Sequence, residues 1–340
     1  MNKEGSLSIN SENIFPIIKK WLYSDHDIFF RELVSNGCDA VTKLKKLDMI
    51  GEYTIPEGKE LCVKVTADAE TKTITFTDNG IGMDANEIDQ YINQIAFSGA
   101  RDFLDKYKDK TNDDQIIGHF GLGFYSAFMV ADRVTIDSLS YKEGAKAVHW
   151  ESDEGTSFEM TDSAKTEIGT TITLYLNEDS YEFCNEYRAK EILDKYCSFM
   201  PIPIYFEAIK TAEEQARIDE AEKKAKEEEE KRKAEEAAKK AADGEAVEAE
   251  TEAEPAEKAP EAPKPINETT PLWAKHPNEC TDEEYKEFYH RVFHDYKEPL
   301  FWIHLNMDYP FNLKGILYFP KINTEYDSIE GTIKLYNNQV

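Results

Sequence analysis

Residues 29–43, FFRELVSNGCDAVTK, are the stretch around which the rest of the chain is interpreted. Read as a helix, this stretch lines one face with polar side chains at i, i+4, i+7 and i+11, namely Glu32, Asn36, Asp39 and Lys43. Its apolar residues fall mostly elsewhere on the cylinder and can pack on a core. A polar helix face of this kind usually points into water, so the face alone does not establish a site.

Two later stretches change that interpretation: DNGIGM at residues 78–83 and GHFGLGFYS at residues 118–126. Glycines in the second stretch allow close backbone approach, and they precede a predicted helix, whose free N–H groups and dipole favour phosphate. A P-loop is excluded because no Lys-Ser or Lys-Thr follows at the required spacing, and a dinucleotide fold is excluded because no parallel βαβ unit precedes the glycines. An aspartate before two spaced glycines is, by itself, most often a turn.

The composition narrows the function classes. The chain of 340 residues is 40% hydrophobic, enough for more than one core, and its formal net charge is −28. That charge argues against nucleic acid as the main partner. The five cysteines form no CxxC pair, which disfavours a structural zinc site or a disulfide framework. With no apolar signal core and no apolar run of about 20 residues, we expect a cytoplasmic protein with no membrane partner.

The predicted fold class is α+β, a two-layer α/β sandwich with a mostly antiparallel sheet covered by helices. Alternating or β-branched segments predict strands over 61–67, 73–78, 133–138, 147–151, 157–160 and 171–176. Helices are expected over 11–22, 86–95, 124–130 and 187–199, with Asp25 or Asp27 capping the long helix of the first paragraph. The polar residues 100–115 are interpreted as a mobile segment.

The composition also predicts three parts of the chain. Residues 1–210 form the first domain, and residues 211–265 form a charged linker, rich in Ala, Glu and Lys and then in Pro, that cannot bury a core. Residues 266–340 carry a helix over 282–293 and strands over 300–305, 314–319 and 332–336. We expect this last part to be the opening of an α/β second domain that continues beyond residue 340.

Taken together, the three stretches resemble the ATPases of gyrase B, MutL, sensor histidine kinases and heat-shock protein 90. The resemblance is much closer to the heat-shock protein 90 chaperones of the bacterial HtpG type. Ser98-Gly99 and Gly169-Thr170-Thr171 resemble further nucleotide motifs of that family. Pro271-Leu272-Trp273 and residues 311–319 resemble the start of its middle domain, which the other three families lack. Phe97 and Tyr91 depart from the family pattern near the hinge of its lid.

The resemblance implies that the chain binds ATP or ADP with Mg²⁺. Asp78 would accept a hydrogen bond from the adenine amino group, and Thr170 would support the same base through ordered water. Asn36 would hold Mg²⁺, and Glu32 would act as the general base that orients the attacking water. The other implied nucleotide-binding residues are Asp39, Lys43, Gly82, Met83, Gly121, Gly123 and Phe124. Two simpler interpretations remain open: Asp78 could cap a turn, and Lys43 could pair with Asp39 on the surface.

The resemblance further implies slow ATP hydrolysis coupled to closure of a lid, residues 99–123, and to clamping of a homodimer around client proteins. An arginine expected from the rest of the middle domain lies outside this sequence, so we expect residues 1–340 to bind nucleotide and to hydrolyse it weakly. Two alternatives remain. One is a DNA-processing ATPase of the MutL or gyrase B type, and the other is a nucleotide-gated interaction module that performs no hydrolysis.

Overall fold

The computed structural model describes most of two compact regions of the chain. The described residues are 25–94, 99, 103, 106, 116–118, 121–211, 215, 217, 263–307, 313–321, 333–336 and 339–340. The predicted helix over 11–22, Phe97, most of residues 100–115 and most of the predicted linker lie outside these ranges. No helix in the described ranges has the length and apolar character needed to cross a bilayer.

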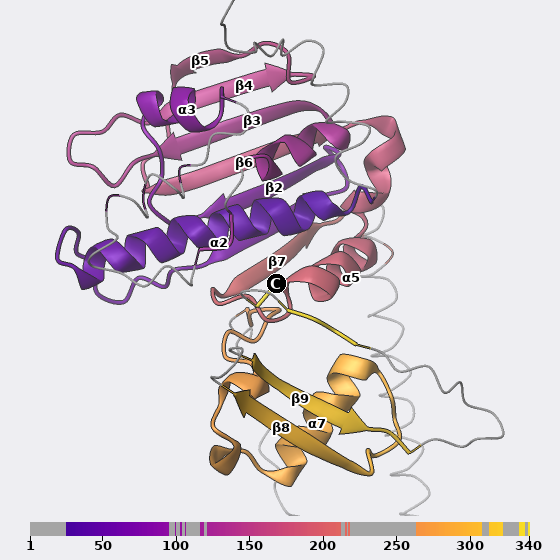
Figure 1. Cartoon of the computed structure of the whole chain (residues 1–340). Helices are drawn as coiled ribbons and strands as arrows, with labels where there is room; N and C mark the ends of the chain where they lie inside the picture. The colour runs from indigo at the N-terminus through magenta and orange to yellow at the C-terminus, as the bar shows by residue number, and fades with distance from the viewer. Residues whose placement is uncertain are drawn as a thin grey trace, which may run out of the picture.

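A seven-stranded sheet with the order β5-β4-β3-β6-β2-β1-β7 forms the first region (Figure 1). Neighbouring strands pair antiparallel except β1 and β7, which pair parallel. The predicted, mostly antiparallel sheet with covering helices is therefore confirmed. Its strands are β1 (Val63–Asp68), β2 (Thr73–Asp78), β3 (Ala131–Leu139), β4 (Val148–Asp153), β5 (Glu159–Asp162), β6 (Gly169–Leu176) and β7 (Ile204–Ile209).

The long helix α2 (Ile28–Met49) lies across one face of this sheet, where Figure 1 shows it in front of β2. Phe29 and Phe30 are fully buried and pack edge to face with Phe76 of β2. Burial of such rings is a strong source of packing energy, and it fixes which face of α2 remains for polar side chains. The other covering elements are α3 (Ala85–Tyr91), the 3₁₀ helices η2 (Gly123–Met129) and η3 (Glu178–Cys184), and α5 (Glu186–Cys197).

Two local predictions are corrected. Asp27 occupies the N-cap position of α2, but its carboxylate makes no capping bond and instead accepts hydrogen bonds from α5. The predicted helix over 124–130 is a 3₁₀ helix rather than an α-helix. Phe124 to Met129 are all buried, and the Ser126 hydroxyl donates to the Gly123 carbonyl at 2.6 Å, a three-residue reach that fits the tighter turn.

The second region pairs strand β8 (Phe301–Met307) with β9 (Leu313–Phe319) and covers one face with α7 (Asp282–Phe293) (Figure 1). Thr281 and Glu284 form the capping box that starts α7. Two short 3₁₀ helices, η4 (Leu272–Ala274) and η5 (Pro277–Glu279), precede it. The strand predicted over 332–336 is wrong for the described residues 333–336, which belong to no strand. The side chains of Ile333 and Leu335 are more than 80% exposed. Among the described residues, no neighbouring strand covers these two apolar side chains of the predicted strand.

Candidate functional site

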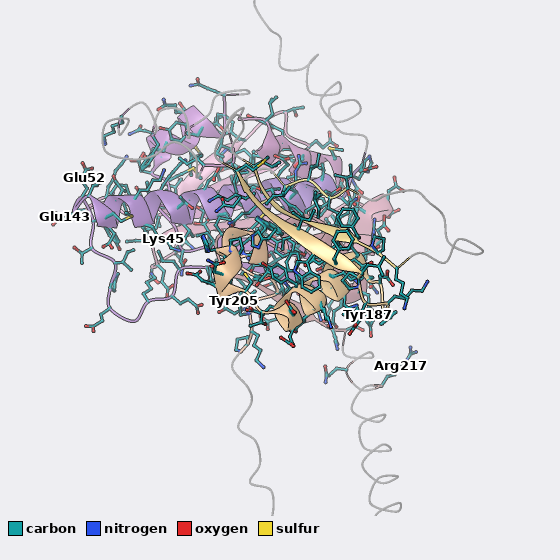
Figure 2. The ribbon with its side chains drawn as sticks, turned by 60° about the horizontal axis from the view of Figure 1, so that its bottom comes forward. Lys45, Glu52, Glu143, Tyr187, Tyr205 and Arg217 are labelled. Carbon is teal, nitrogen blue, oxygen red and sulfur yellow. The ribbon has the colours of Figure 1, made fainter. Side chains whose placement is uncertain are left out.

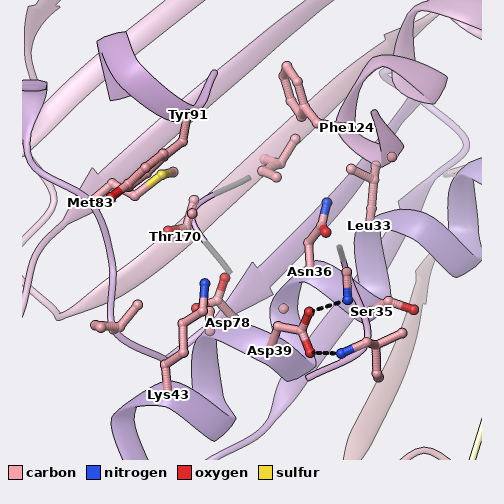
Figure 3. Close-up of a pocket in the computed structure, with 18 of the residues that line it drawn as sticks. Leu33, Ser35, Asn36, Asp39, Lys43, Asp78, Met83, Tyr91, Phe124 and Thr170 are labelled. Atoms are coloured by element: carbon pink, nitrogen blue, oxygen red, sulfur yellow. Dashed lines mark hydrogen bonds between the residues drawn. The ribbon is translucent and has the colours of Figure 1, made fainter. Parts of the chain in front are cut away.

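A cavity of about 810 Å³ opens between α2, the ends of β2 and β6, and the glycine-rich segment before η2 (Figure 3). This volume lies within the range typical of small-molecule sites. Every site residue predicted from the sequence lines it. These residues are Glu32, Asn36, Asp39, Lys43, Asp78, Gly82, Met83, Gly121, Gly123, Phe124 and Thr170.

Asp78 ends β2 at the floor of this cavity, beside Thr170 of the neighbouring strand β6. The Gly80 N–H donates to Asp78 Oδ1 at 2.9 Å, so the carboxylate does hold the following turn. Burial raises the pKa of Asp78 to about 7, against the lowering effect of the Gly80 hydrogen bond and of Lys165 and Lys43. A buried carboxylate at a cavity wall is suited to accept a further hydrogen bond from a ligand.

Ser138, which the sequence interpretation missed, is a buried residue that bonds two residues of the cavity wall. Its hydroxyl lies 2.9 Å from Thr170 Oγ1 and accepts a hydrogen bond from the Met83 N–H at 2.9 Å. Ser138 of β3 pairs directly with Thr170 of β6. It therefore couples the end of the sheet to the turn that follows Asp78. The feature of the sequence that could have identified Ser138 was its position at the end of the predicted strand 133–138, on the same edge of the sheet as Thr170.

The turn after Asp78 is wedged between α2 and the end of β3. The Ile81 N–H donates to the Ala40 carbonyl at 3.1 Å, and the Ile81 carbonyl accepts from the Tyr141 N–H at 2.9 Å. Gly82 has a φ of 63°, and a Cβ there would lie 1.9 Å from the Leu139 carbonyl oxygen. Only glycine fits this position, because both the backbone conformation and the space exclude a side chain.

The Glu32 carboxylate points at the glycine-rich segment. Arg31 Nε donates to Glu32 Oε1 at 3.0 Å, and a second nitrogen of Arg31 bonds the same oxygen. The other oxygen, Oε2, lies 2.4 Å from where a Cβ at Gly123 would stand. Gly123 thus lets the backbone approach the carboxylate, while Arg31, which the sequence interpretation did not single out, sets its orientation.

Asp39 holds the backbone of the segment 116–118. Its two carboxylate oxygens accept hydrogen bonds from the Ile117 N–H at 2.8 Å and the Gly118 N–H at 2.7 Å, and both bonds are drawn in Figure 3. Asn36 Oδ1 lies on the same side, 3.5 Å from a Cβ built at Gly118. On the polar helix face predicted from the sequence, Asp39 therefore fixes the backbone at the start of the glycine-rich segment.

The remaining predicted residues frame the cavity walls. Lys43 has its ammonium 6.0 Å from the centre of the Phe103 ring, and in Figure 3 its side chain extends toward Asp78. Tyr91 and Met83 also line the cavity, and Figure 3 draws both. The Phe124 ring is buried against Trp150, with ring centres 5.8 Å apart, so the ring packs in the core.

Known proteins match this chain over nearly its whole length. Residues 28–178 match a family described as histidine kinase-, DNA gyrase B-, and HSP90-like ATPase, and residues 182–340 match the family described as Hsp90 protein. A protein named chaperone protein HtpG from Bacteroides fragilis is 48% identical over 338 residues, 99% of this chain and 43% of that protein. A protein of the same name from Porphyromonas gingivalis is 43% identical over 340 residues, which are 100% of this chain and 43% of that protein. The chain therefore spans less than half the length of these relatives.

Proposed function

The chain belongs to the Hsp90 family, and from that premise we propose that its cavity binds ATP or ADP with Mg²⁺ and that the protein acts as an ATP-dependent molecular chaperone. The observation that carries the proposal is the convergence of every predicted nucleotide residue on one cavity. The family match over residues 182–340 also disfavours a DNA-processing ATPase. Hydrolysis, lid closure, clamping of a homodimer and binding of client proteins are proposals for the protein in which this chain works.

The purine would lie against Asp78. Its exocyclic amino group is a donor, and the Asp78 carboxylate is a buried acceptor whose Oδ1 already accepts from the Gly80 N–H. Thr170, which pairs with Asp78 in the sheet and whose hydroxyl lies 2.9 Å from that of Ser138, is suited to hold a water that the base would share.

The triphosphate would run toward the glycine-rich segment. Gly121 and Gly123 carry no side chain, so their backbone can approach phosphate oxygens, as can the Phe124 N–H. Among the described residues, no group of three or more His, Cys, Asp and Glu side chains could hold a metal ion by itself. Mg²⁺ prefers a few protein oxygens together with phosphate and water, and the Asn36 amide oxygen would be one of them. When bound, Mg²⁺ would neutralise charge on the phosphates.

Glu32 would act on the attacking water. Arg31 holds Oε1, so Oε2 is the oxygen free to accept a proton beside Gly123. The side chain of Glu32 is only 20% exposed, which limits competing contacts with bulk water. Asp39 keeps residues 117 and 118 in place next to it.

A crystal of the chain grown with ADP and MgCl₂ tests this arrangement directly. We expect density for the adenine within hydrogen-bonding distance of Asp78, and density for a metal ion beside Asn36 and the β-phosphate. A nucleotide bound elsewhere on the chain, or a purine turned away from Asp78, would overturn the proposal. A matching soak with GDP should leave the cavity without ordered base, because its carbonyl would face the carboxylate.

The Glu32→Gln variant separates binding from hydrolysis. We expect its affinity for Mg·ATP, measured by calorimetry, to stay within about twofold of the wild type, because the amide keeps the shape of the side chain. We expect its hydrolysis rate to fall about a hundredfold or more, the usual contribution of a general base. The rate is measured in single-turnover assays with protein in excess over labelled ATP. Hydrolysis at the wild-type rate by Glu32→Gln would remove Glu32 from the catalytic role.

A further inference from the structure

The start of α2 is held by α5 rather than by a cap. Asp27 is 7% exposed, and its carboxylate accepts hydrogen bonds from Lys195 Nζ at 3.1 Å and from the Tyr196 hydroxyl at 3.0 Å. Both donors belong to α5. Since no side chain caps the first N–H groups of α2, this tertiary contact replaces the local one in fixing how the helix begins.

Tyr196 also contacts the next turn of α2. The guanidinium carbon of Arg31 lies 5.9 Å from the centre of the Tyr196 ring, within the range of a cation–π contact. Asp27 and Arg31 are four residues apart and so lie on one face of the helix. A single side chain of α5 therefore contacts this face at both Asp27 and Arg31, one residue before the proposed general base.

Arg31 stands between two cavities. It lines the cavity described above and a second one of about 800 Å³, which Lys195 and Tyr196 line as well. Among the residues that the structure describes, its guanidinium bonds the Glu32 carboxylate and lies over the ring of Tyr196.

We infer that Tyr196 is a positioning residue for Glu32, an inference that rests on the proposed function for its catalytic meaning. The Tyr196 hydroxyl fixes Asp27 and its ring fixes Arg31, and Arg31 in turn orients the Glu32 carboxylate so that Oε2 faces Gly123. Loss of the hydroxyl removes one of the two hydrogen bonds that α5 makes to Asp27, leaving that from Lys195, and so loosens the first turn of α2. The Arg31–Glu32 pair then samples more orientations, although the pair itself keeps both partners.

The test is the Tyr196→Phe variant, which removes one oxygen and keeps the ring. The matched control is Tyr187→Phe on the same helix, where the ring is 83% exposed (Figure 2). The main readout is the hydrogen-exchange rate of the Arg31 Nε–H by NMR without nucleotide, with the signal assigned by its loss in Arg31→Lys. Thermal midpoints and calorimetric titration with Mg·ADP accompany each variant.

We expect Tyr196→Phe to speed exchange at the Arg31 Nε–H about tenfold, toward the rate in Glu32→Gln, while Tyr187→Phe keeps the wild-type rate. A lower thermal midpoint with an unchanged Arg31 rate would assign Tyr196 a purely structural role and overturn the inference. If Tyr196→Phe does not fold, Asp27→Asn, which weakens the same contact, is expected to give the same acceleration, and an unchanged rate there overturns it. Because the exchange readout needs no nucleotide, absence of ADP binding would defeat the proposed function alone.

Discussion

Replacing Asp78 by asparagine is expected to weaken the binding of Mg·ATP at least about a hundredfold. Asparagine keeps an oxygen for the Gly80 N–H, which now donates to Asp78 Oδ1 at 2.9 Å. Its second polar atom becomes an amino group, so a donor would face the donor on the purine. Calorimetry with Mg·ATP measures the loss. Wild-type affinity for Mg·ATP in this variant would show that the Asp78 carboxylate does not bind the purine amino group.

The same substitution is expected to stabilise the protein without nucleotide at pH 8. Burial raises the pKa of Asp78 to about 7, so the folded chain holds that proton more tightly than the unfolded chain, whose aspartate titrates near 3.8. Between those values the wild type therefore loses stability as the pH rises. Asparagine removes this dependence, and the variant should exceed the wild type in thermal midpoint by more at pH 8 than at pH 5. Equal differences at both values would contradict the raised pKa.

Opposite effects on affinity and stability would identify Asp78 as a functional residue rather than a turn residue. If the carboxylate served only to hold the turn, its replacement by an amide would destabilise the protein, because a charged acceptor makes the stronger bond to an N–H. A carboxylate buried for a ligand destabilises the empty protein and recovers that free energy when the ligand donates to it. Whether Asp78 serves as a turn residue or as a ligand-binding residue is therefore decided by the thermal midpoint without nucleotide. A lower midpoint in Asp78→Asn indicates the turn, and a higher one indicates the ligand.

The sequence predicted the sheet and the main helix well because both follow from period and burial. β2 and β6 lie almost where alternation placed them, and α7 has the predicted bounds. The polar face of α2 could be found because helical spacing brings Glu32, Asn36 and Asp39 to one side whatever the rest of the fold. Their convergence on Asp78 could not be found that way, and it rested on the family resemblance.

What the sequence did not predict depends on contacts between distant elements. Asp27 has the residue type of a helix cap, yet α5 supplies partners that the local pattern cannot reveal. Ser138 is an ordinary strand residue until the pairing of β3 with β6 places it beside Thr170. The 3₁₀ form of η2 was not predicted either. A segment buried on all sides has no polar face, so its hydrophobic periodicity does not indicate the type of helix.

The Gly82→Ala variant is expected to cause the largest loss of stability at the site. A Cβ there would lie 1.9 Å from the Leu139 carbonyl oxygen and 2.6 Å from its carbon, and neither backbone atom can rotate away. We expect a loss of about 3 kcal/mol or more, or failure to fold, because the turn must leave the end of β3. Urea denaturation followed by circular dichroism measures it.

Gly144→Ala is the matched control, because it shares the strained backbone without the clash. Gly144 has a φ of 74° against 63° for Gly82, and nothing lies within 4 Å of a Cβ built there. An alanine in this conformation costs about 1 kcal/mol from the backbone alone. The difference between the two variants therefore isolates the close approach of the turn to β3. Equal losses would mean that conformation alone requires glycine at position 82, and that the turn could move away from Leu139 without disturbing Asp78.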